Sequence, residues 1–242
     1  MVLLYGYGYG YYPYFDPTYI LVLIGVLISL WASFRVRSTF ARYSGVRSRT
    51  GMTGAQAAER ILYSCGIYDV RIERVSGSLT DHYDPRRKVL RLSDSVYGSD
   101  SLAAIGVAAH ECGHAIQHQT SYAPLVLRST IVPIANFGSM MAWPIIILGV
   151  ILSYNQFLIN LGILLFSAAV LFQLITLPVE FNASKRAIAR LSETGILYGD
   201  ELSQSKKVLD AAALTYVAAA AASILQLLRL IILFGGGRKR DR

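Results

Sequence analysis

Cysteine is scarce in this sequence: its 242 residues include only Cys65 and Cys112. Two cysteines form no disulfide framework, which excludes the small secreted proteins that depend on one and favours a reducing, cytoplasmic environment. A secretory signal is not expected, because no basic segment precedes the first apolar run and no small-residue cleavage site follows it. A glycine-rich phosphate loop is also lacking, so any ATP-driven unfolding of a substrate would have to come from a partner.

Charged residues are few as well. They make up 16% of the chain, whereas hydrophobic residues make up 54%, above the roughly 45–50% of soluble proteins. Long apolar runs cover residues 18–34, 131–152, 157–177 and 211–234. A transmembrane helix needs about 20 apolar residues, so the sequence predicts an integral membrane protein whose second and third runs form a hairpin. The last run precedes a basic tail, and it either crosses the membrane against the positive-inside rule or packs partly on the rest of the protein.

Five arginines follow the first apolar run with no acidic residue among them: Arg35, Arg37, Arg42, Arg47 and Arg49. Such an excess of basic residues beside a membrane span is typical of the cytoplasmic side. Nucleic-acid binding is the alternative interpretation, but we do not expect it here, because the cluster adjoins a span. The formal net charge of +8 is better explained by the anionic lipids of the bilayer.

The residues from 101 to 119 predict a helix, since they are rich in Ala, Leu and Ile and contain no proline. Within them the motif His-Glu-x-x-His places His110 and His114 one turn apart on one face, about 5.4 Å along the axis. Two such histidines can bind one Zn²⁺, and the neighbouring Glu111 can take a proton from a water that the metal activates. The chemistry that this arrangement predicts is hydrolysis of an amide bond.

The alternative is a buried helix whose histidines are hydrogen-bonded core residues. Two residues of the motif argue against it. Gly113 costs about 1 kcal/mol relative to Ala in a helix interior, so it is expected where substrate or a facing element comes close. Glu111 would be an unpaired buried charge in an apolar stretch unless a metal site employs it.

A catalytic zinc site needs a third protein ligand. His118 continues the series, but it lies about 12 Å from His110 along a straight helix, too far to share one ion, so we expect it in a supporting or surface position. Glu180 is the better candidate, because we expect Pro178 to end one apolar helix and Glu180 to begin the next segment. A glutamate at a helix start is equally explained by the helix macrodipole. Ser184 follows one turn later and is placed to hydrogen-bond a metal ligand.

Several segments of the chain resemble the YugP-like membrane-bound neutral zinc metallopeptidases of bacteria. They agree in order and spacing from about residue 35 to residue 234. The matching segments are Gly51-Met52-Thr53-Gly54-Ala55 and residues 79–85, 89–93, 104–117, 177–184 and 211–220. The resemblance implies a gluzincin, similar in layout to the membrane CAAX and heat-shock metalloproteases, whose third ligand is a glutamate in a Glu-x-x-x-Asp helix. Carried onto this chain, that ligand is Glu180, and Ser184 stands where the relatives carry Asp.

The expected fold class is a predominantly α membrane protein with a small α+β zincin-like catalytic domain and three to four transmembrane helices. In chain order we expect a Tyr/Gly-rich tail (1–17), a transmembrane helix (18–34), a cytoplasmic zinc peptidase domain (35–130), a transmembrane hairpin (131–177), a cytoplasmic helix with the third ligand (178–210), an Ala-rich helix (211–234) and a basic tail (235–242). The two crossings of the hairpin return Glu180 to the side of His110 and His114.

Short strands are predicted at residues 70–75 and 89–92, where apolar and polar residues alternate. Strands beside the motif helix are what a gluzincin uses to align an extended peptide by edge pairing. Asp81 and His82 precede a turn at residues 83–86. They either cap this turn, which we favour, or bind substrate and stabilise the oxyanion.

The expected function is that of a zinc metalloendopeptidase of the cell membrane, which takes Zn²⁺ as cofactor and a protein or peptide as substrate. We expect Glu111 to be catalytic, and His110, His114 and Glu180 to hold the metal. An intramembrane site-2-type protease also uses His-Glu-x-x-His, but it needs the motif deep in a span and a distant Asp ligand. The alternative from another class is a catalytically inactive membrane scaffold or chaperone-like partner, which need hold no zinc.

Overall fold

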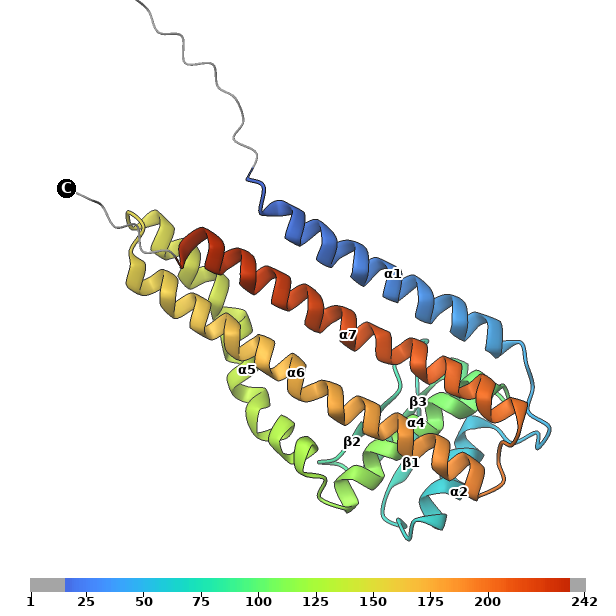
Figure 1. The fold of residues 1–242 in the computed structure, drawn as a ribbon. Helices are drawn as coiled ribbons and strands as arrows, with labels where there is room; N and C mark the ends of the chain where they lie inside the picture. The colour runs from blue at the N-terminus through green and yellow to red at the C-terminus, as the bar shows by residue number, and fades with distance from the viewer. Residues whose placement is uncertain (1–15, 236–242) are drawn as a thin grey trace, which may run out of the picture.

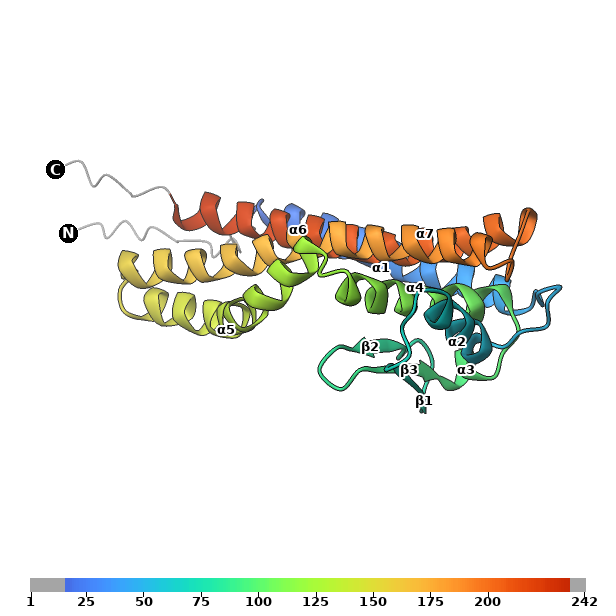
Figure 2. The same cartoon turned by 90° about the horizontal axis from the view of Figure 1, so that it is seen from below.

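The computed structural model describes residues 16–235, so most of the N-terminal tail and the basic C-terminal tail predicted above lie outside it. Its helices are α1 (Tyr19–Ser44), α2 (Gly54–Ser64), α3 (Asp94–Tyr97), α4 (Leu102–Gln119), α5 (Ala123–Ile151), α6 (Gln156–Glu193) and α7 (Asp200–Phe234), and its strands are β1 (Arg71–Val75), β2 (His82–Asp84) and β3 (Val89–Ser93). Long helices run alongside one another, and α2, α4 and the sheet gather at one end of them (Figures 1 and 2). We call this the catalytic end, after the role expected from the His-Glu-x-x-His motif of α4, and the opposite one the distal end.

Four helices are long and apolar enough to cross a membrane, namely α1, α5, α6 and α7. Large apolar side chains on their outer faces are exposed, as Leu30 and Phe157 illustrate. Such faces are what lipid covers in a spanning helix. The number of candidate spans is therefore four, the upper value of the prediction.

The last helix both packs on the catalytic end and reaches the distal end. It begins at Asp200 instead of near 211, and its first turns bury Glu201 and Val208. Further along it packs beside α1 (Figure 1), and near the distal end the amide of Gln156 donates to the carbonyl of Phe234 over 3.0 Å. The two alternatives left by the sequence thus describe two halves of one helix.

The prediction that Pro178 ends a helix is wrong, because α6 continues from Gln156 to Glu193 with Pro178 inside it. Proline removes one backbone hydrogen bond from a helix, a loss that neighbouring helices can offset in a packed bundle. Here α6 packs against α4, α5 and α7. Glu180 consequently lies in the middle of a helix, and the macrodipole, which acts within the first turn, does not explain it.

The motif helix α4 lies at the centre of the catalytic end. Its side chains are buried along most of its length, and the hydroxyl of Ser101 caps it by accepting a hydrogen bond from the backbone N–H of Ala104 (3.2 Å). Against it packs α2, which begins with a capping box: Thr53 and Gln56 each accept from the other's backbone N–H. A core formed by α2, α3, α4, β3, α6 and α7 therefore holds the motif rigidly.

The small sheet has the strand order β1-β3-β2. β3 is the central strand, with Ile72 of β1 parallel to Leu90 on one side and Tyr83 of β2 antiparallel to Leu90 on the other. The strands predicted at residues 70–75 and 89–92 are confirmed as β1 and β3. β2 forms one edge of the sheet and contacts α4, so this edge lies beside the motif helix (Figure 2).

Candidate metal centre

The two motif histidines lie on the side of α4 that meets α6. Their rings are 4.8 Å apart between centroids and nearly perpendicular. Gly113 allows α6 to approach this closely, because a Cβ at that position would lie only 2.4 Å from the carbonyl oxygen of Ala183. The glycine of the motif is therefore explained by a facing helix, one of the two reasons expected from the sequence.

Glu180 on α6 presents one carboxylate oxygen to both histidines. Its Oε2 lies 3.3 Å from Nε2 of His110 and 3.5 Å from Nε2 of His114. The three candidate ligand atoms all lie within 4.8 Å of one another. Tetrahedral zinc with bonds of about 2.0–2.1 Å separates its ligand atoms by about 3.3–3.4 Å, so the spacing suits one ion held by three residues.

Gln117 fixes which nitrogen of His114 carries the proton. The Gln117 amide nitrogen donates to the carbonyl of Val179 (2.7 Å) and to Oδ1 of Asn182 (3.0 Å), which leaves its Oε1 facing Nδ1 of His114 at 3.0 Å. An amide oxygen can only accept, so His114 donates from Nδ1. Its Nε2 then points a lone pair at Glu180.

A lone pair and a carboxylate oxygen that face each other require a positive charge between them. Glu180 Oε2 is buried and has no hydrogen-bond partner among residues 16–235, a costly state for such an atom. Burial lowers the pKa of His114, but contact with Glu180 and the charge of Glu111 outweigh it, and the pKa is raised above its ordinary value. The site thus favours a cation, and its two imidazoles and one carboxylate are a donor set typical of zinc.

The second histidine is oriented from the facing helix. Nδ1 of His110 lies 3.1 Å from Oγ of Ser184, one turn after Glu180 on α6. The sequence predicted that Ser184 could hydrogen-bond one of the candidate metal ligands, and the structure shows this contact. A hydroxyl can accept the Nδ1 proton without adding a negative charge, so both rings are held with Nε2 towards Glu180.

Sequence reasoning missed Arg128. This residue lies on α5, and its Nη1 donates to Oε1 of Glu180 over 3.2 Å. The contact neutralises the carboxylate and leaves Oε2 for the histidines. The signal that could have found it is its setting, because an arginine at the start of a long apolar helix usually has a specific partner.

Glu111 is buried next to His110 and makes no hydrogen bond or ion pair within the described part of the chain. Beside the histidines a groove of about 680 Å³ runs between the β2–β3 hairpin and α5. The residues that line it include Tyr83, Pro85, His114, Gln117, Leu125 and Ser129. A free carboxylate, a candidate metal site and a groove of mixed polarity therefore lie together.

The structure does not bring His82 or His118 to the ligand atoms. His82 is exposed on β2, where its ring contacts the carbonyl of Thr80 (2.9 Å) and Arg91 (3.3 Å). His118 is exposed in the groove and hydrogen-bonds the Tyr83 hydroxyl over 2.9 Å. Asp81 accepts from the backbone N–H (2.7 Å) and hydroxyl (3.0 Å) of Ser93 at the end of β3. The expectation that Asp81 and His82 cap the turn is wrong, because the turn is capped by Asp84, which accepts from the backbone N–H groups of Arg86 and Arg87 (3.0 and 3.2 Å).

Comparison with known proteins identifies a family and a relative. A protein family described as "Putative neutral zinc metallopeptidase" matches residues 18–235. The chain is 54% identical over 221 residues to "Putative membrane protease YugP" of Bacillus subtilis (strain 168), an alignment that covers 91% of this chain and 98% of the relative. No solved structure matches. The resemblance inferred from the sequence is confirmed, and the chain belongs to the family described as "Putative neutral zinc metallopeptidase".

Proposed function

We propose that the protein is a membrane-embedded zinc metalloendopeptidase in which His110, His114 and Glu180 hold the metal. One observation carries the proposal: Glu180 Oε2 faces Nε2 of both histidines at 3.3 and 3.5 Å, although the contact of His114 Nδ1 with the Gln117 oxygen leaves no proton on Nε2 of the neutral His114 ring. Membership of a zinc metallopeptidase family supports the same ion. A scaffold that binds no metal gives no reason for a carboxylate oxygen to face the imidazole nitrogens in this way.

Glu111 is the residue that moves protons in the proposed reaction. A zinc ion bound here supplies Lewis acidity, which makes water more acidic and polarises a carbonyl. Glu111 follows His110 directly, so its carboxylate is close enough to take the proton of the attacking water and then to give it to the leaving amine. Because Glu111 makes no hydrogen bond or ion pair within residues 16–235, its carboxylate is available for both transfers.

The remaining polar residues hold the reacting groups in place. Gln117 keeps His114 in one tautomer, and Gln117 and Ser184 together hold the two imidazoles in one orientation. Arg128 fixes Oε1 of Glu180, which prevents the carboxylate from turning. These contacts come from α4, α5 and α6, so the site depends on the packing of the hairpin against the motif helix.

The groove beside His114 suits an extended peptide. One wall is the β2–β3 hairpin. Among the described residues β2 pairs with β3 alone, so the other edge of β2 is open. A peptide backbone can pair with such an edge while its side chains contact the opposite wall, where Leu125 and Val126 of α5 lie. We infer that the substrate is a protein segment in extended conformation.

We place the catalytic end in the cytoplasm. Arg35, Arg37 and Arg42 lie on the part of α1 nearest that end, and Lys185 and Arg190 lie on the corresponding part of α6. Basic residues beside spans favour the cytoplasmic side. Four crossings would put both chain ends of the described segment on the opposite side.

The test measures zinc content and hydrolysis of a labelled unfolded protein, such as casein, on the purified full chain. The wild type is expected to hold about one zinc per chain and to hydrolyse casein. The Glu111→Gln variant is expected to retain zinc but to lose activity by about 10²–10⁴-fold, the contribution of a general base. Glu59→Gln serves as the matched control, because it removes the same charge from an exposed position of α2. It should change neither the zinc content nor the hydrolysis of casein.

Two results would overturn the proposal. Full activity of Glu111→Gln would reject the role of Glu111. Absence of zinc from the wild type even after loading would favour the scaffold alternative.

A further inference from the structure

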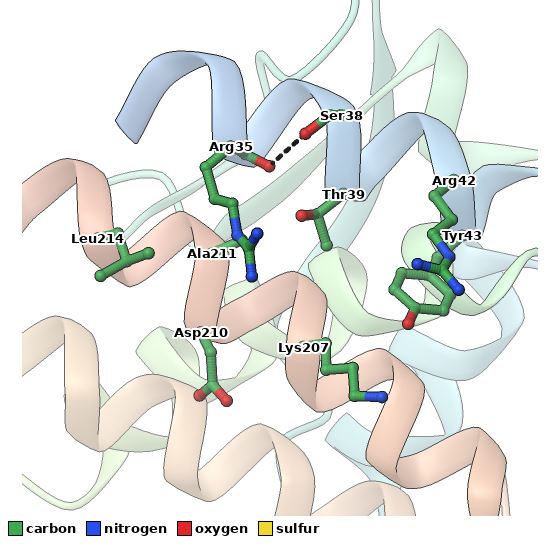
Figure 3. Close-up of a pocket in the computed structure, with 9 residues that line it drawn as sticks. All are labelled: Arg35, Ser38, Thr39, Arg42, Tyr43, Lys207, Asp210, Ala211 and Leu214. Atoms are coloured by element: carbon green, nitrogen blue, oxygen red, sulfur yellow. Dashed lines mark hydrogen bonds between the residues drawn. The ribbon is translucent and has the colours of Figure 1, made fainter. Parts of the chain in front are cut away.

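A cavity of about 610 Å³ lies between α1 and α7, away from the metal centre (Figure 3). Its walls carry charged groups and hydroxyls, contributed by Arg35, Ser38, Thr39, Arg42, Lys207 and Asp210. None of these residues takes part in the proposed hydrolysis. The cavity therefore needs an explanation of its own.

The position of the cavity along the helices is defined by charge. In α1 no charged residue occurs from Tyr19 to Phe34, and Arg35 is the first. In α7 none occurs from residue 211 to 228, and Asp210 immediately precedes that stretch. The cavity lies where the uncharged stretches of both helices end, which is the level of lipid headgroups for helices that span a bilayer.

The cations of the cavity are not neutralised by the protein. Arg35, Arg42 and Lys207 form no ion pair with any residue of the described chain, and all three are exposed. Some exposed cations elsewhere at the catalytic end are paired, for example Arg47 with Asp100 and Arg74 with Asp94, each at 2.6 Å. Others, such as Arg60, form no ion pair within the described residues, but they do not line this cavity. The one carboxylate among the lining residues, Asp210, is engaged by Lys206 at 2.6 Å. The cavity lining thus has an excess of positive charge.

Its donors are arranged around one space. In Figure 3 the guanidinium of Arg35 extends from α1 towards α7, while Arg42 and Lys207 approach from the two helices further along. The Thr39 hydroxyl makes no hydrogen bond within residues 16–235. Arginine binds phosphate oxygens in pairs, and lysine adds a point charge. Leu214 supplies an apolar wall on the side of the uncharged stretches.

We propose that this cavity binds the phosphate of an anionic phospholipid headgroup. The phosphate lies between Arg35, Arg42 and Lys207, and the acyl chains extend along the uncharged stretches of α1 and α7. A bound lipid would link the two helices at the catalytic end. The inference rests on the membrane placement of these helices and not on hydrolytic activity.

The experiment is native mass spectrometry of the full chain in detergent with added phosphatidylglycerol or phosphatidylcholine. The test variant is Arg35→Gln/Arg42→Gln/Lys207→Gln. The control, Arg60→Gln/Arg71→Gln/Arg87→Gln, removes the same charge from exposed positions of α2, β1 and the β2–β3 turn. Each basic residue near an anionic surface contributes about fivefold, so the test variant should bind phosphatidylglycerol about a hundredfold more weakly, while the control binds as the wild type does.

A second variant protects the test against misfolding. Asp210→Asn removes the one acid from the cavity and frees Lys206, so it should bind phosphatidylglycerol about fivefold more tightly. Unchanged binding in both variants, or equal weakening in test and control, would overturn the proposal. Equal binding of phosphatidylcholine would reject the selection of an anion. Millimolar glycerol 1-phosphate or inorganic phosphate could also displace the bound phosphatidylglycerol. Displacement as effective as that by added lipid would show that a free phosphate is the ligand.

Discussion

The distal and catalytic halves of the long helices are held together by different kinds of contact. In the distal half small residues set the close helix approaches: a Cβ on Gly25 of α1 would lie 3.2 Å from Ala222 of α7, and one on Gly162 of α6 would meet Ile146 of α5 at 2.4 Å. Polar contacts occur there at the helix ends, as between Gln156 and the carbonyl of Phe234. In the catalytic half α6 buries the polar Glu180, and buried Gln117 of the adjoining α4 donates to the carbonyl of Val179 on α6.

This difference shows what each half specifies. Close packing of small residues sets how near two helices lie, but it tolerates shifts of a few tenths of an ångström. Hydrogen bonds among buried groups specify individual atoms, since a buried donor or acceptor without a partner costs about 1–3 kcal/mol. The metal centre lies in the half where atoms, and not only helices, have fixed positions.

The change with the largest expected effect is Glu180→Ala, which removes the carboxylate that faces both histidines. Zinc content should fall from about one per chain to near zero, with a loss of affinity beyond the 10–100-fold typical of outer partners. Elemental analysis of the purified variant measures it. Glu193→Ala is the matched control, because Glu193 lies at the exposed end of the same helix and pairs only with Arg190. Zinc retained without Glu180 but lost without Glu193 or His82 would move the third ligand.

A smaller effect is expected from Gln117→Ala. The ligands remain, but Nδ1 of His114 loses its acceptor and the carbonyl of Val179 loses its donor. Zinc affinity should fall about 10–100-fold, as measured by competition with a chelator. Gln119→Ala, two residues later and exposed, should leave the affinity unchanged. Equal affinities for the Gln117 variant and the wild type would show that the tautomer of His114 is set by other groups.

The smallest effects come from adding one methyl group to a glycine in each half. Gly113→Ala places Cβ 2.4 Å from a backbone oxygen of α6, so we expect a loss of about 1–3 kcal/mol in unfolding free energy and weaker zinc binding. Gly25→Ala meets Ala222 at 3.2 Å, and a gain of about 1 kcal/mol in helix propensity offsets the strain. Thermal unfolding in detergent and zinc content compare the two. Loss of zinc in Gly25→Ala would contradict the division between the halves.

Local patterns predicted what depends on local geometry. His110 and His114 share a face because a helix repeats every 3.6 residues, and β1 and β3 follow from alternation within a few residues. The capping box at Thr53 and Gln56 is likewise a short-range feature. The four spans follow from composition and length alone.

The missing parts of the site depend on tertiary packing. Pro178 is a local signal for a helix end, but packing of α6 between α4, α5 and α7 overrides it. Arg128 contacts Glu180, which is 52 residues away in the chain. Gln117 contacts Val179, which is 62 residues away, and both partners lie on α6. The residues alone left Glu180 undecided between two roles, and only the resemblance to a family selected it.

The continuity of α6 fixes the distance between the distal end and Glu180. Glu180 follows Gln156 by about 36 Å along one unbroken axis, at 1.5 Å per residue. With Gln156 at one edge of a hydrocarbon core of about 30 Å, the metal centre stands about 6 Å above the other edge. For the proposed peptidase, membrane thickness would therefore set the height at which a substrate is cut, and a thicker bilayer would lower the centre towards the lipid surface. A membrane-anchored substrate would be cleaved at a fixed distance from its own span.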